Sequence, residues 1–114
     1  MVQFGLTAYG SYLPFQSISR QAIFDQIGWV QGGLKAYARG KRSYADWDED
    51  AVTLAVAAAR QLLNTTDAAQ VQNLSFASTT APFLDRSNAG IVAAALDLAD
   101  HTNCHDSSGS QRAA

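Results

Sequence analysis

Apolar and polar or small residues alternate in two stretches of the chain, residues 2–13 and 71–77, and this period of two predicts strands. Three other stretches, residues 19–34, 48–63 and 90–99, repeat apolar residues every three or four positions, as one face of a helix does. A further strand-like segment precedes residue 106. Strands that alternate with helices indicate the α/β fold class, with alanine-rich helices that can approach their neighbours closely.

Polar and flexible residues mark the ends of the predicted helices. Ser19 is expected to cap the first helix, and Gly32 with Gly33 to end it. The run Asp48-Glu49-Asp50 lies at the start of the second helix, where the helix dipole favours acidic side chains. These signals place the second helix more firmly than the first, which Gly28 weakens.

The composition describes a globular chain of one domain, residues 1–114, and excludes several classes of protein. Hydrophobic residues make up 47% and charged residues 16%, and a net charge of −2 gives no electrostatic footprint for nucleic acid. No apolar run approaches the roughly 20 residues that cross a bilayer, and the first residues lack the basic region of a secretory signal. A single cysteine excludes an internal disulfide and fits a reducing, cytoplasmic setting.

Cys104 is the residue of this chain best suited to covalent chemistry. The residues from Asp106 onward are expected to form the cap and first turn of a fourth helix. Cys104 would then lie just ahead of the positive end of that helix, a position that lowers the pKa of a thiol and favours nucleophilic attack. A buried, inert cysteine is the alternative.

Two other groups of residues suggest ligands. The first could bind a transition metal by residue type, although the chain holds no other Cys or His to complete a site: His101, Cys104, His105 and Asp106. The second lies in an expected loop over residues 39–47 and could hold a phosphate, or be a solvated loop: Lys41, Arg42 and Tyr44.

Arg20 is placed unfavourably at the start of the first helix, where the dipole disfavours a cation. This position suggests a partner for the guanidinium. A salt bridge to Asp25 or Asp48 is the simplest explanation.

Three stretches together resemble the N-terminal part of the thiolase superfamily, closest to hydroxymethylglutaryl-CoA synthase and ketosynthase III-like enzymes. The first ends in Tyr12-Leu13-Pro14, like the first strand of that family. The second is the acidic start and alanine-rich helix of residues 48–60, and the third joins Ser78-Thr79-Thr80-Ala81-Pro82 to the helix of residues 89–96.

The resemblance implies a partial thiolase-like fold, with an incomplete first half and a mixed sheet. It implies an acyl-CoA or acyl-carrier thioester as substrate, no bound cofactor, and a homodimer of the full-length protein. It assigns Cys104 as the residue that accepts the acyl group as a thioester. In this family a carbanion equivalent then condenses with a thioester whose developing negative charge is stabilised in an oxyanion hole.

The chain departs from the family at three points. Thr79 stands where hydroxymethylglutaryl-CoA synthases carry a glutamate general acid/base, and threonine cannot replace a carboxylate in proton transfer. Asn103 replaces the small apolar residue before the cysteine. The chain has 114 residues, whereas family members have several hundred, so the fragment alone is expected to be inactive. A non-catalytic interaction module of the same fold and a small metal-binding protein are the alternatives.

Overall fold

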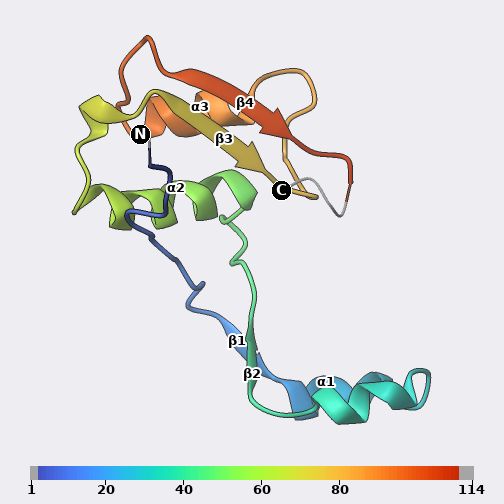
Figure 1. Ribbon diagram of the computed structural model, residues 1–114. Coiled ribbons are helices and arrows are strands. Elements are labelled where there is room, and N and C mark those ends of the chain that lie inside the picture. Colours follow the sequence, from blue (N-terminus) through green and yellow to red (C-terminus); the bar gives the residue numbers. More distant parts are fainter. Residues whose placement is uncertain (1–2, 111–114) are drawn as a thin grey trace. The chain divides into compact units, whose positions relative to one another are not determined.

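The computed structural model describes residues 3–110, which form two compact units (Figure 1). The smaller unit is Leu13–Asp48, and the larger one combines the residues before Leu13 with those after Asp48. The first residue of the predicted N-terminal strand, Val2, lies outside the described range, as do residues 111–114. No helix in the described range is long and apolar enough to cross a membrane.

The larger unit is built on two parallel strands, β3 (Asn73–Ala77) and β4 (Asn103–Ser107). The register pairs Leu74 with Cys104 and Phe76 with Asp106. Helix α3 (Asn88–Ala95) packs against both strands, and α2 (Ala51–Leu63) packs against α3 (Figure 1). A short 3₁₀ turn, η2 (Ala68–Gln70), follows α2. This arrangement confirms the α/β class and the strand predicted near residues 71–77.

The acidic run before α2 works as a helix cap. The Asp50 carboxylate accepts a hydrogen bond from the Thr53 N–H at 2.8 Å, and the Thr53 hydroxyl accepts one from the Asp50 N–H at 2.7 Å. This reciprocal capping box satisfies two backbone donors that a helix start leaves unpaired. The predicted start of the second helix is therefore confirmed.

Small side chains make up much of the core of the larger unit. The buried cluster joins one face of α2, one face of β3 and the first half of α3: Val52, Val56, Phe76, Ala89 and Val92. Ala89 is fully buried, so α3 lies close to its neighbours at that point. The side chains expected to be buried on α2 and β3 are buried at Val52, Val56 and Phe76 and half-buried at Ala59, Leu63 and Leu74.

The N-terminal segment forms no strand, contrary to the prediction for residues 2–13. Residues 3–13 make no strand pairing, and several of their large side chains are exposed: Phe4, Leu6, Tyr9 and Leu13. The segment instead contacts α2, where the Ser11 N–H donates to Gln61 Oε1 at 2.7 Å. A period of two predicts a strand only where a partner edge is available, and the larger unit offers this segment a helix surface.

Replacing Gly10 by alanine should detach this segment from α2. A Cβ at Gly10 would lie 2.5 Å from the Ala58 carbonyl oxygen and 2.8 Å from the Leu62 nitrogen, and helix backbone cannot move aside cheaply. We expect a loss of about 1–3 kcal/mol in the free energy of unfolding, typical of overpacking, and faster hydrogen exchange at the Ser11 amide. Gly5→Ala is the matched control, because a Cβ there meets nothing within 4 Å. Equal effects of the two substitutions would contradict this packing.

The smaller unit combines an antiparallel pair, β1 (Ser17–Ser19) and β2 (Lys41–Ser43), with helix α1 (Arg20–Ile27) and a 3₁₀ helix, η1 (Gly32–Tyr37). The strands of the described residues form two small sheets, one antiparallel (β1 with β2) and one parallel (β3 with β4). The expected loop over residues 39–47 contains β2.

Two predicted helix ends need correction. Helix α1 begins after Ser19 as predicted, but it ends at Ile27 rather than at Gly32. The Gly28 N–H caps the Phe24 carbonyl, and a side chain at residue 28 would collide with the Phe24 ring. Helix α3 ends at Ala95 rather than residue 99, because Asp97 has a left-handed backbone with φ 53°.

Candidate functional site

The candidate site lies where β3 and β4 end, at the loop of residues 78–87 that joins β3 to α3, here called the β3–α3 loop. In open α/β sheets, the carboxyl ends of parallel strands are where ligands bind. The Ser78 N–H donates to the Ser107 carbonyl at 3.0 Å, so the pairing of the strands continues into the loop. An open hollow of about 620 Å³ lies between this strand end and α2, lined by Ala51, Leu54, Ala55, Phe76, Ser78 and Thr80 among others.

Asp106 ties β4 to the start of α3. Its Oδ2 accepts hydrogen bonds from the Asn88 N–H at 2.7 Å and the Asn88 Nδ2 at 3.0 Å, and its Oδ1 accepts one from the Ala89 N–H at 2.6 Å. The two backbone N–H groups belong to the first turn of α3 and have no partner within the helix. A carboxylate is favoured there because the N-terminal end of a helix carries partial positive charge.

The hydrogen bonds set the protonation of Asp106. Partial desolvation raises the pKa of its carboxyl, but the donors of Ala89, Asn88 and Ser87 outweigh that effect and lower the pKa below its ordinary value. Asp106 therefore carries its negative charge over a wider acidic range than an ordinary aspartate.

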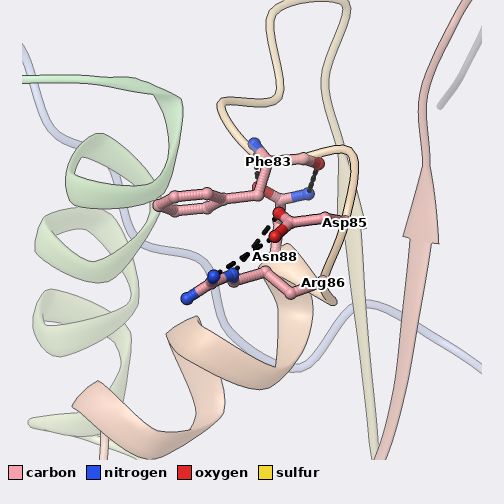
Figure 2. Close-up of polar contacts among 4 residues, drawn as sticks. All are labelled: Phe83, Asp85, Arg86 and Asn88. Atoms are coloured by element: carbon pink, nitrogen blue, oxygen red, sulfur yellow. Dashed lines mark hydrogen bonds and ion pairs between the residues drawn. The ribbon is translucent and has the colours of Figure 1, made fainter.

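Asn88 holds the β3–α3 loop with its side-chain amide, as Figure 2 shows. Its Oδ1 accepts from the Phe83 N–H at 3.1 Å, and its Nδ2 donates to the Phe83 carbonyl at 2.9 Å. Only 2% of Asn88 is exposed. The oxygen and the nitrogen of its amide nevertheless both form hydrogen bonds, and these are with other groups of the protein. Together, Asp106 and Asn88 fix the loop relative to β4 and α3.

Arg86 lies over the same loop, beside Phe83 and Asp85 (Figure 2). Its guanidinium forms an ion pair with Asp85 at 3.2 Å and lies 5.2 Å from the centre of the Phe83 ring. Both charged side chains are mostly exposed, at 60% and 71%, so the pair adds little stability. It shapes the outer surface of the loop.

The predicted position of Cys104 ahead of a helix is wrong. Cys104 is the second residue of β4, which continues through Asp106 and Ser107, where the helix was expected to begin. Its half-buried side chain packs against the core cluster, and its Sγ donates to the Thr102 carbonyl at 3.6 Å. Cys104 shares a sheet face with Asp106, whose carboxylate occupies the nearest helix N-terminus. Neither hollow described for residues 3–110 is lined by the sulfur.

The residues proposed as metal ligands do not converge. Cys104 and His105 are consecutive in β4, so their side chains point to opposite faces of the sheet. Across residues 3–110, no three His, Cys, Asp or Glu side chains form a group that could hold a metal ion.

The other candidate residues lie in both units of the structure. Thr79 is exposed in the β3–α3 loop, and Lys41 and Arg42 lie in β2 of the smaller unit. Tyr44 extends that pairing, because its N–H donates to the Gln16 carbonyl at 3.1 Å. The sequence did not predict that Asn88 and Asp106 would bond to each other and hold the loop. Ser87-Asn88, a cap signal before an alanine-rich run, was the available clue.

Comparison with curated proteins finds two similar enzymes, both hydroxymethylglutaryl-CoA synthases. That of Aeropyrum pernix is 30% identical over 104 residues, and that of Methanococcoides burtonii is 32% identical over 99 residues. The matches cover 90% and 82% of this chain but only 29% and 28% of those proteins. The chain thus spans less than a third of the length of these relatives. No protein-family model matches the chain.

Solved structures show the same fold. OleA from Xanthomonas campestris matches 90% of the chain with a TM-score of 0.74 at 20% identity, and the chain covers 32% of it. The 3-oxoacyl-(acyl carrier protein) synthase III of Xanthomonas oryzae matches 89% with a TM-score of 0.70 at 19% identity, and the chain covers 33% of it. The chain therefore has a partial thiolase-type fold. The resemblance to thiolase-superfamily condensing enzymes that the sequence indicated is confirmed.

Proposed function

We propose that the chain is part of an enzyme that transfers or condenses acyl groups delivered as thioesters of CoA or of a carrier protein. The observation that carries this proposal is the match to OleA over 90% of the chain, joined to the two synthase relatives. One OleA structure holds lauric acid and lauroyl-CoA, which shows the kind of ligand that such a fold can accept in that protein. The homodimer and the cytoplasmic location stay predictions.

The β3–α3 loop is the part of this chain that we assign to the reaction. Asn88 and Asp106 hold it at the carboxyl end of the strands, beside the open hollow that Ser78 and Thr80 line. Thr79 offers a hydroxyl but no carboxylate at the position that the resemblance gives to a general acid/base. Acyl transfer or a Claisen-type condensation therefore fits better than hydroxymethylglutaryl-CoA synthesis.

The acyl-acceptor role of Cys104 stays a prediction from the resemblance. Cys104 is the only cysteine in the chain, so any thioester formed within these 114 residues must form there. Its side chain packs against the core, which is the setting of a structural cysteine rather than of an open nucleophile. Cys104→Ala separates the two roles, because only a nucleophile is indispensable for turnover.

The full-length product of the gene should release free CoA from acetyl-CoA or lauroyl-CoA, whereas the 114-residue chain alone should not. The reason is that the chain covers less than a third of its relatives, so groups from the rest of the fold are needed to complete a site. A thiol-reactive dye measures the CoA released. Release by neither protein would contradict the proposed function, and equal release by both would contradict the need for a longer chain.

A non-catalytic interaction module is the second candidate, and one observation favours it. Each unit has large apolar side chains that are at least 85% exposed, as expected where another polypeptide covers a protein surface. They are Phe4, Leu6 and Leu84 in the larger unit and Phe15, Trp29 and Trp47 in the smaller unit. The same measurement separates the candidates, because an interaction module releases no CoA.

A further inference from the structure

A second hollow lies within the smaller unit, between α1, η1 and β2. Its volume is about 230 Å³, and Ile23, Phe24 and Leu34 give it an apolar wall. Arg20, Tyr37 and Arg42 supply its polar groups. Two cations and a phenol around an apolar wall are a combination that binds organic anions, since ligand pockets are mostly apolar with a few well-placed polar groups.

Neither arginine of this hollow forms an ion pair within the described residues, although a salt bridge was expected for Arg20. Asp25, the expected partner of Arg20, accepts a hydrogen bond from Gln21 at 2.7 Å, and no ion pair in the described part of the chain involves Arg20 or Arg42. Arg20 is also the first residue of α1, whose first turn holds no acidic residue and whose cap, Ser19, makes no side-chain hydrogen bond. The Arg20 guanidinium therefore has no charged partner in the described part of the chain, and the Arg20 N–H at the start of α1 donates to the Gly40 carbonyl at 3.0 Å rather than to an acidic group.

We propose that this hollow binds a small organic anion with an apolar body and one oxyanion group, a carboxylate or a phosphate. The oxyanion lies between Arg20 and Arg42, because planar guanidinium groups form paired, charge-assisted hydrogen bonds with such groups. The apolar body lies against Phe24 and Leu34, and the Tyr37 hydroxyl offers a further donor. A volume below the roughly 300–1,000 Å³ of common ligand pockets limits the body to about one ring or a short chain.

Isothermal titration of the protein with phenyl phosphate, hexanoate and inorganic phosphate tests this proposal. Phenyl phosphate or hexanoate should bind more tightly than inorganic phosphate, and added salt should weaken the binding. Their comparison shows whether a phosphate or a carboxylate is preferred. Arg20→Gln and Arg42→Gln should each weaken the preferred probe by about tenfold or more, the loss expected for a hydrogen bond to a charged group. Circular dichroism checks that the variants keep their fold.

Lys41→Gln is the matched control. It removes one positive charge, as the arginine substitutions do, from a residue that is next to Arg42 in β2 but does not line the hollow. It should leave the affinity within about twofold of the original, because Coulomb interactions between solvent-exposed charges are weak. Binding of inorganic phosphate at least as tight as that of both phenyl phosphate and hexanoate would overturn the proposal, since the apolar wall would then contribute nothing. Absence of binding by all three probes, or an equal loss in Lys41→Gln, would also overturn it. The proposal does not depend on acyl transfer, so failure of the CoA-release assay leaves it standing.

Discussion

Asp106→Ala should lower the free energy of unfolding by about 2–3 kcal/mol and unwind the first turn of α3. The substitution removes the acceptor for the N–H groups of Asn88 and Ala89, a loss comparable to that of a helix cap, about 1 kcal/mol. It also removes an acceptor of the buried Asn88 amide, and a buried donor left unpaired costs about 1–3 kcal/mol. Urea unfolding measures the total, and hydrogen exchange at Ala89 locates it.

Two variants control this prediction. Asp106→Asn keeps one side-chain acceptor and should cost less than Asp106→Ala. Asp85→Asn removes a carboxylate from the exposed pair with Arg86 and should change stability by no more than about 0.5 kcal/mol. A loss in Asp85→Asn as large as that in Asp106→Ala would show that Asp106 has no special position in the fold.

The same carboxylate predicts how stability depends on pH. The pKa of Asp106 is lower in the folded chain than the roughly 3.9 of an unfolded aspartate, so its contribution is complete above that value. Stability is lost as the pH falls from about 4 through the folded pKa, because the protonated carboxyl is a poorer acceptor. Asp106→Asn should lack this part of the acid dependence. An unchanged acid profile in the variant would contradict the assignment.

Phe76→Ala should cost about 3–4 kcal/mol, the largest effect that we expect from one substitution. Phe76 is 6% exposed and belongs to the core cluster that β3 forms with α2 and α3. Removing a buried aromatic ring loses its transfer free energy and leaves a cavity. Phe76→Leu keeps most of the volume and should cost less than about 1.5 kcal/mol.

Phe83→Ala is the matched control for the core, because the Phe83 ring lies in the β3–α3 loop and is 36% exposed. It should cost roughly 1 kcal/mol, mainly through the lost contact with the Arg86 guanidinium. Urea unfolding compares the three variants. If Phe76→Ala and Phe83→Ala cost the same, the core is not where the structure places it.

Local signals in the sequence were sufficient for some elements and insufficient for others. Asp50 and Thr53 lie three residues apart, so the start of α2 is set by neighbours in the chain and could be predicted. The segment around Gly10 has the alternation of a strand, but whether it pairs depends on an edge supplied from far along the sequence. It lies on α2 instead, where Ser11 meets Gln61, fifty residues away.

In the candidate site too, contacts between residues far apart in the sequence decide the structure where local signals do not. Small and polar residues after Asp106 resemble a helix cap, yet pairing with β3 extends β4 through Ser107. The Asp106 carboxylate does cap a helix, but that helix is α3, which begins eighteen residues earlier at Asn88. A contact of this kind depends on sheet register, and no local spacing in the sequence encodes it. The prediction that Cys104 lies beside a helix N-terminus failed for this reason.

Mass spectrometry of the intact full-length gene product, after incubation with acetyl-CoA and an acid quench, tests the central claim most directly. The proposed function predicts a mass increase of one acetyl group that hydroxylamine removes, as it does from a thioester. Peptide mapping, repeated with Cys104→Ala, then locates the adduct at Cys104 or elsewhere in the protein. A protein that takes up no acetyl group and releases no CoA would contradict the assignment of this chain to an acyl-transferring enzyme.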